Sequence, residues 1–137
     1  MLKLEIIIPL SQIQRLLKQV RIAFPREVSG IILGQEFGPY TILSFIGTSI
    51  EENTPFTFCI RDVEINSISD SIRCSEKRIR GCFHSHVFGS ARPSIYDCAA
   101  EKEVGDLWLI FSVKFSDIKV FRWDGITFQK QRFRITK

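Results

Sequence analysis

The stretch GCFHSHVFGSARPSIYD, residues 81–97, contains both histidines of this 137-residue chain. His84 and His86 are one residue apart, at the end of an apolar run that is typical of a strand. Side chains two residues apart in a strand point to the same side of a sheet, so both imidazoles should face one way. Ser94 and Asp97 follow, after a segment whose glycine and proline allow the chain to turn back.

His84, His86 and Asp97 could converge on one metal ion. Two strand residues at this spacing have Cβ atoms roughly 6–7 Å apart, which lets both rings reach the same ion. Three protein ligands would leave a fourth position open for water, as in catalytic rather than structural zinc sites. Simpler interpretations exist, because a His-x-His pair often occurs without metal. Ser94 and Asp97 also fit a helix capping box, a role that is compatible with metal binding because it would fix the carboxylate.

Metal-assisted hydrolysis also needs a base that accepts a proton from water. Glu27 is the best candidate, because it stands at the start of the apolar stretch EVSGIILG, residues 27–34. A glutamate at such a position is often only a solvated strand end. Gly30 would allow close backbone packing beside it.

The remaining pattern predicts one domain of mixed helices and strands, without repeats, linkers or low-complexity segments. A capping box at Ser11 to Gln14 should open a helix that presents Phe24 among its apolar residues. A second or third helix should run from Ser94 to about Val104, and Asp124-Gly125 predicts a two-residue hairpin. Strands are predicted for residues 4–8, 27–34, 40–46, 56–60, 79–83, 107–113, 118–123 and 128–137.

Composition indicates a soluble globular protein, with 45% hydrophobic and 25% charged residues. The apolar run near the N-terminus is too short and too charged for a signal sequence, and no stretch approaches transmembrane length, so we expect a cytoplasmic protein. The cysteines form no Cys-x-x-Cys pair and should be reduced and buried. Cys98, at the expected helix start, could instead serve as a nucleophile or ligand.

The net charge of +4 tolerates an acidic or nucleic-acid partner without requiring one. Lys130, Arg132 and Arg134 alternate with uncharged residues, so a strand would place them on one face. They could protect an edge strand, or they could bind an acidic protein surface or a phosphate backbone.

The order Glu27, His84-x-His86, seven residues, Ser94, two residues and Asp97 resembles the pattern of the JAMM (MPN-plus) zinc metalloproteases. The stretches EVSG and GIILG around Gly30, and EENTPFTFCI at residues 51–60, are also similar to that family. The resemblance extends from about Phe24 to Val113, and the combined pattern is far more specific than its parts.

The resemblance implies a single JAMM/MPN-type metalloprotease domain over residues 1–137. Its fold would be α/β, a mixed curved β-sheet flanked by helices, with a layout related to the cytidine deaminases. Zn²⁺ would be held by His84, His86 and Asp97. Glu27 would take a proton from the attacking water and deliver it to the leaving amine, while Ser94 would hydrogen-bond the oxyanion.

The resemblance also implies a substrate, namely the amide or isopeptide bond after the C-terminal tail of a ubiquitin-like protein. That tail would lie as an extended strand beside the site. Partners would include E1-like or E2-like proteins of a bacterial conjugation or phage-defence pathway, and no membrane. The chain resembles small bacterial members, since it has no room for the insertions with which eukaryotic deubiquitinases grip ubiquitin.

One departure is Val87, where many members, especially the RadC type, have proline after the second histidine. This should alter the loop rather than the ligands. The alternatives are a non-catalytic MPN scaffold and a RadC-like protein that binds nucleic acid. A zinc deaminase is disfavoured because its His-x-Glu and Pro-Cys-x-x-Cys signature is absent.

Overall fold

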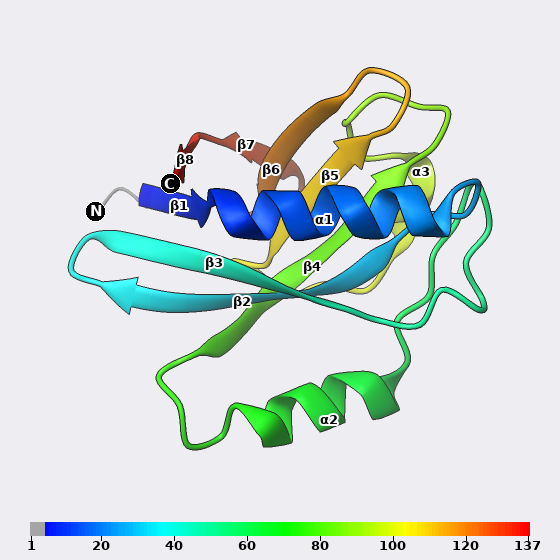
Figure 1. Cartoon of the computed structure of the whole chain (residues 1–137). Coiled ribbons are helices and arrows are strands. Elements are labelled where there is room, and N and C mark those ends of the chain that lie inside the picture. The colour runs from blue at the N-terminus through cyan, green and yellow to red at the C-terminus, as the bar shows by residue number, and fades with distance from the viewer. Residues whose placement is uncertain (1–4) are drawn as a thin grey trace.

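The computed structural model describes residues 5–137, which form an eight-stranded mixed sheet and three helices (Figure 1). This is the α/β fold with a curved sheet that the sequence predicts. The helices are α1 (Leu10–Ala23), α2 (Asp62–Ser71) and α3 (Ile95–Ala99). The strands are β1 (Glu5–Pro9), β2 (Ser29–Phe37), β3 (Tyr40–Gly47), β4 (Arg78–His86), β5 (Leu107–Ser112), β6 (Asp117–Trp123), β7 (Phe128–Gln131) and β8 (Phe133–Thr136).

The strand order is β7-β6-β5-β4-β2-β3-β1-β8. β4, which carries the histidines, is central and pairs antiparallel with β2 and parallel with β5. β7 and β8 are the opposite edges of the sheet, although only Arg132 separates them in the chain. The sheet must therefore curve round so that its two edges approach each other. The single last strand expected over residues 128–137 is thus wrong, because its two halves pair with different neighbours.

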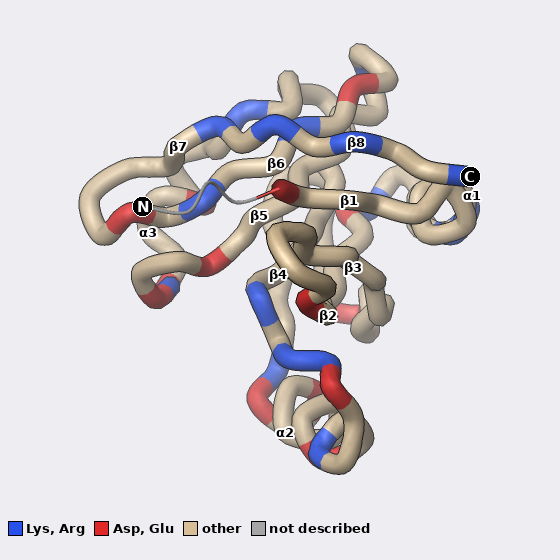
Figure 2. The backbone as a smooth tube through the Cα atoms, turned by 90° about the vertical axis from the view of Figure 1, so that its left-hand side faces the viewer, with Lys and Arg blue, Asp and Glu red and all other residues tan. Residues whose placement is uncertain are grey.

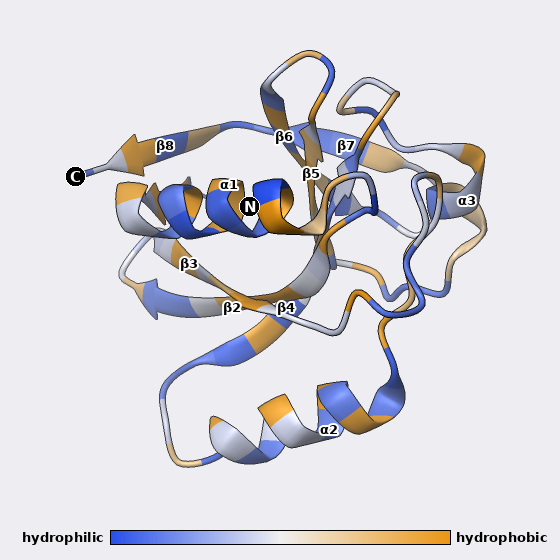
Figure 3. Cartoon of the chain, turned by 45° about the vertical axis from the view of Figure 1, so that its right-hand side comes forward, coloured by the Kyte–Doolittle hydropathy of each residue, from blue (hydrophilic) through white to orange (hydrophobic). Residues whose placement is uncertain are grey.

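α1 covers one face of the sheet and forms the main core with it. Its buried residues recur at helical spacing, and hydrophobic and hydrophilic bands alternate along it (Figure 3). They pack on apolar residues that point to the same face, among them Ile32, Leu43, Phe83 and Leu109. This packing stabilises the central strands from behind the histidines.

The N-terminus of α1 differs from the prediction. The helix begins at Leu10, directly after β1, and Ser11 provides no side-chain cap. Gln12 instead accepts a hydrogen bond from the backbone N–H of Phe45 through Oε1, at 3.0 Å. The helix ends at Ala23, so Phe24 lies beyond the apolar face and is 56% exposed.

The opposite face of the sheet carries α2 and α3. Ile31 and Leu33 of β2 pack with Ile68 of α2, and Ile110 of β5 packs with Ala91 and Phe121 in a separate cluster. The register places Ile31 opposite Cys82 and Ile110 opposite His84, so both histidines lie on this face. In the described part of the chain, no helix has the length and hydropathy needed to cross a membrane.

Two glycines allow backbones to approach closely near the histidines. A Cβ on Gly30 would lie 2.2 Å from the ring of Phe83 and 2.3 Å from the carbonyl oxygen of Ile46. A Cβ on Gly81, which has φ +155°, would lie 1.7 Å from the carbonyl oxygen of Leu107. The close packing expected at Gly30 is therefore confirmed, and Gly81 keeps β4 tight against β5.

Several local predictions need correction. Residues 56–60 are irregular rather than a strand of the sheet, because β4 already has neighbours on both sides. The Asp124-Gly125 hairpin is present, but four residues connect its strands and Asp124 accepts hydrogen bonds from the N–H groups of Ile126 and Thr127. All four cysteines are free, as predicted, but three are exposed and Cys82 is half-buried.

The second predicted helix, α3, is also shorter than expected, since it ends at Ala99. The Nζ of Lys102 donates to the carbonyl oxygens of Asp97 and Cys98, each at 2.9 Å. Carbonyls at a helix C-terminus lack partners within the helix, so Lys102 caps the end of α3.

Candidate metal centre

The structure brings His84, His86 and Asp97 together in a buried cluster. Nε2 of His84 lies 3.0 Å from Nε2 of His86 and 3.0 Å from Oδ1 of Asp97. Nε2 of His86 lies 3.1 Å from Oδ2 of Asp97. Ligands about 2.0–2.1 Å from a tetrahedral ion are separated by roughly 3.3 Å, so small side-chain adjustments would admit one.

The hydrogen-bonding roles in this cluster fit a cation. Nδ1 of His86 lies 2.7 Å from the carbonyl oxygen of Ser90, which can only accept, so Nδ1 carries a proton. In neutral His86, Nε2 therefore has a lone pair that faces Nε2 of His84 and the carboxylate of Asp97, so three potential ligand atoms converge. A metal ion is the group that accepts all three, and a backbone carbonyl behind a histidine is the usual support for a ligand.

Aromatic rings set the orientation of His84. The ring of Phe58 stacks on the imidazole, with centroids 4.3 Å apart, and Trp108 meets it edge-on at 5.7 Å. Nδ1 of His84 has no hydrogen-bond partner among residues 5–137. On its Nδ1 side, packing rather than hydrogen bonding therefore orients this imidazole, and the rings keep water from that side of the cluster.

Glu27 lies beside the cluster although it precedes β2. The register pairs Ser29 with His84, and a 3.0 Å hydrogen bond from the N–H of Ser85 to the carbonyl of Val28 continues the pairing. Glu27 is then opposite His86 and on the same sheet face. Its side chain is only 3% exposed. The strand end predicted to carry the base is thus buried next to the ligands and not solvated.

The two carboxyl groups of the site differ in their electrostatics. Burial raises the pKa of Glu27 to about 8, a rise that nearby His86 reduces and Asp97 reinforces. Burial also acts to raise the pKa of Asp97, but hydrogen bonds from His84 and His86 outweigh it and hold that pKa well below its usual range. Asp97 is therefore the permanent negative ligand, while Glu27 can hold a proton. Different environments commonly separate the pKa values of two neighbouring carboxyl groups in this way.

The raised pKa predicts how stability depends on pH in the metal-free protein. The unfolded chain releases the Glu27 proton near the ordinary value of 4.5, and the folded chain releases it near 8. Stability from this group is therefore present below pH 4.5 and is lost as pH rises through 8.

The glutamine of Glu27→Gln does not titrate. Relative to this variant, the free energy of unfolding of wild type should fall by on the order of 3–4 kcal/mol between pH 5 and pH 8. Urea unfolding of both proteins with a chelator, at several pH values, measures this difference. Parallel stability profiles would contradict it.

Ser94 is the N-cap of α3, as predicted. Its Oγ accepts from the backbone N–H of Asp97 at 3.2 Å, and the carboxylate of Asp97 accepts from the N–H of Ser94 at 2.8 Å. Oδ2 of Asp97, which makes this cap, also faces His86, so capping and metal binding use the same carboxylate. The hydroxyl hydrogen of Ser94 stays available for another acceptor.

Three residues that support the site were not predicted from the sequence. Asn53 is buried; its Nδ2 donates to the carbonyl of Glu27 at 2.8 Å and its Oδ1 accepts from the N–H of Cys59. Ser85, between the histidines, accepts from the N–H of Val28 at 2.8 Å through Oγ. Phe58 stacks on His84. Their contacts with Glu27, Val28 and His84 span at least 26 positions, so no local pattern could have shown them.

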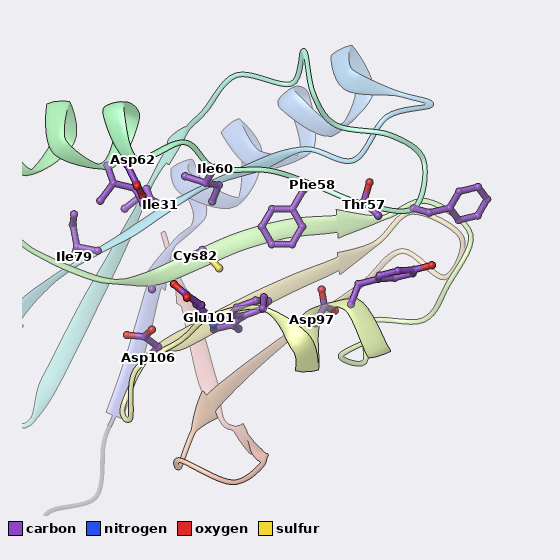
Figure 4. Close-up of a pocket in the computed structure, with 16 residues that line it drawn as sticks. Ile31, Thr57, Phe58, Ile60, Asp62, Ile79, Cys82, Asp97, Glu101 and Asp106 are labelled. Carbon is purple, nitrogen blue, oxygen red and sulfur yellow. The ribbon is translucent and has the colours of Figure 1, made fainter.

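A groove of about 550 Å³ leads away from Asp97 along β4 (Figure 4). Phe58 stands on one side and α3 with Tyr96 on the other, while Gly81 and Cys82 lie along its floor. Asp62, Glu101 and Asp106 line its far end. Cys98 is not among these lining residues, and no structural feature of the cluster uses it as a ligand.

Comparison with known proteins agrees with this geometry. The model of a family described as prokaryotic homologs of the JAB domain matches residues 9–124. No curated protein sequence matches the chain.

Solved structures share the fold, including the following two. One is the solution structure of a protein from Desulfitobacterium hafniense, 21% identical, with a TM-score of 0.85, covering 96% of this chain and 93% of its own. The other is the crystal structure of a JAB1/MPN domain protein from Archaeoglobus fulgidus, 18% identical, with a TM-score of 0.61, covering 96% of this chain and 98% of its own. The chain thus has a JAB/MPN-like fold with a buried His-His-Asp group that is consistent with the metal site of a metallohydrolase.

Proposed function

Because the chain belongs to the prokaryotic homologs of the JAB domain, we propose that it is a zinc-dependent peptidase that cuts the amide bond after the C-terminal tail of a ubiquitin-like protein. The observation that carries the proposal is the convergence of three buried ligand atoms beside the buried carboxyl group of Glu27. His84, His86 and Asp97 would hold the ion. The enzyme would act in the cytoplasm, on a conjugate or a precursor, within a bacterial ubiquitin-like or phage-defence pathway.

Zinc held by His84, His86 and Asp97 would supply a Lewis acid for the carbonyl and for water, and its charge would favour the ionised form of Glu27. Glu27 then accepts a proton from water as the water oxygen attacks the carbonyl carbon. When the C–N bond breaks, Glu27 returns that proton to the departing amine. Asn53 and Ser85 bond to the carbonyl and the N–H of the Glu27–Val28 peptide and fix the position of Glu27 for both transfers.

Ser94 is proposed to donate its free hydroxyl hydrogen to the carbonyl oxygen as negative charge develops there. We expect Ser94→Ala to lower kcat by about 10²–10³-fold, the usual cost of losing one oxyanion donor. Loss of the cap should also lower stability by about 1 kcal/mol.

Steady-state kinetics with zinc content as a parallel readout test this role. Ser94→Thr is the matched control, since it keeps a hydroxyl at the same position. If zinc binding falls in Ser94→Ala and kcat per bound zinc does not, the residue only positions Asp97.

The groove supports an extended, small-residue substrate. Near Asp97 it is lined by Phe58 and Tyr96, so aromatic side chains would flank the end of a bound tail. Among residues 5–137, the backbone N–H groups of Phe58 and Ile60 have no hydrogen-bond partner, whereas Cys59 between them bonds to Asn53. Alternate residues of an extended segment offer their backbone groups on the same side, so a substrate strand can add there.

The far end of the groove supports a basic residue in the tail. Asp62, Glu101 and Asp106 line it, and none of the three makes an ion pair within the described chain. A lysine or arginine a few residues before the scissile bond would supply the opposite charge.

The proposal is tested with ubiquitin-like proteins that carry a short extension after Gly-Gly, or a lysine isopeptide there. Cleavage by the zinc-loaded protein, measured by mass spectrometry, should occur after the second glycine and stop with chelator. Tails ending in Ala-Ala, or with glutamate replacing the upstream basic residue, are the matched controls and should be cut more slowly. Cleavage of all tails at the same rate, or no cleavage of any tail, would overturn the substrate assignment. Zinc binding without cleavage would favour the non-catalytic scaffold.

A further inference from the structure

A second pocket lies on the same face of the sheet, on the other side of α3 from the groove. It has a volume of about 420 Å³. Arg92 and Pro93 of the loop before α3, Cys98 of α3, and Lys119 of β6 line it, together with Phe128 and Lys130 of β7. None of these residues lines the groove or belongs to the metal cluster.

The pairing of β6 with β7 gathers the cations of this pocket. Phe121 pairs with Lys130, so the two side chains lie on one face, and Lys119, two residues from Phe121, shares it. Arg92 reaches the same hollow from the loop. Lysine and arginine recur along β6, β7 and β8 (Figure 2).

Little negative charge opposes these three cations. The lining, which consists entirely of described residues, includes no carboxylate. Within residues 5–137, Arg92 and Lys130 form no ion pair, and Lys119 has only the half-exposed Asp117, at 3.6 Å. Three like charges around one hollow repel one another, and a multiply charged anion would remove that repulsion.

The size and floor of the pocket indicate which anion fits. A free phosphate would fill only a small part of a volume that lies within the 300–1,000 Å³ usual for small-molecule sites. Pro93, Phe121 and Phe128 offer apolar surface between the cations. We propose that this pocket binds a small organic phosphate of nucleotide size, with its phosphate groups on Arg92, Lys119 and Lys130. This site goes beyond the proposed hydrolysis and does not depend on it.

Calorimetric titration of the full chain with ADP at low ionic strength tests the proposal. Wild type should bind ADP, and Lys119→Gln/Lys130→Gln should bind it about tenfold more weakly or worse, the effect of losing charge-assisted hydrogen bonds. The matched control is Lys18→Gln/Arg21→Gln, which removes the same charge from exposed positions of α1 and should change affinity less than about twofold.

NMR amide shifts locate the ADP, because binding at the metal centre would shift His84 and Phe58 rather than Cys98 and Thr127. The same titration is repeated with pyrophosphate and with a short single-stranded oligonucleotide. No binding, equal weakening in both double variants, or shifts confined to the metal centre would overturn the proposal. So would pyrophosphate binding as tightly as ADP, or an oligonucleotide binding more tightly through the same two lysines. Cleavage of Gly-Gly substrates by Lys119→Gln/Lys130→Gln shows separately whether the proposed hydrolysis stands.

Discussion

Glu27→Gln is expected to bind zinc like wild type and to hydrolyse its substrate about 10²–10⁴-fold more slowly, the range for loss of a general base. The side chain keeps its size, and Asn53 holds the backbone carbonyl of residue 27 rather than its carboxylate, so the strand end should not move. Zinc should remain because Glu27 is not one of the three converging ligands. Only the proton acceptor is removed.

Single-turnover rates and zinc content measured on the same preparation separate chemistry from metal loss. Glu5→Gln is a matched control, because it makes the same change at an exposed position of β1, beyond β2 and β3 from β4. Wild-type turnover in Glu27→Gln would show that another group takes the proton. A parallel loss of zinc would make Glu27 a ligand or a structural support.

Asp97→Asn is expected to weaken zinc binding by more than about 100-fold, which exceeds the 10–100-fold typical for residues that only support a ligand. The amide removes the negative charge that faces both histidines. Its oxygen can still accept from the N–H of Ser94, so the cap of α3 should persist. Activity should be lost together with the metal.

Competition with a chromophoric chelator measures the zinc affinity, and circular dichroism checks the fold. Ser94→Ala is the complementary variant, since it removes the other half of the cap and leaves the carboxylate. If Ser94→Ala weakens zinc binding as much as Asp97→Asn does, the cap rather than the carboxylate governs the metal. His86→Gln provides a second ligand variant should Asp97→Asn fold poorly.

The sequence predicts that His84, His86 and Asp97 lie together because the patterns that place them are local. The strand period places His84 and His86 on one face, and the capping pattern places Asp97 at the third position of α3. Glu27 is predicted as a base from its place at the start of an apolar stretch and from the family resemblance, but its approach to His86 depends on the pairing of β2 with β4.

The rest depends on contacts between distant segments. Asn53 and Phe58 come from a loop whose alternating pattern is typical of a strand. The loop cannot join the sheet beside the histidines, because the central strands already have neighbours on both sides. The pattern of residues 128–136 predicts one strand. Because the sheet curves, the first half of this segment pairs with β6 and the second half with β1. The C-terminus of α3 is capped by the ammonium group of Lys102 and not by a glycine or proline, a contact that the sequence pattern does not predict.

Zinc per chain is the measurement that tests the central claim most directly, in wild type purified without added metal and in His86→Ala beside it. Plasma mass spectrometry gives the ratio, and circular dichroism confirms that both proteins are folded. The account predicts about one zinc in wild type and little in the variant, as for a site with three protein ligands. Folded wild type that takes up no zinc even when zinc is offered would contradict it, and the domain would then be a scaffold.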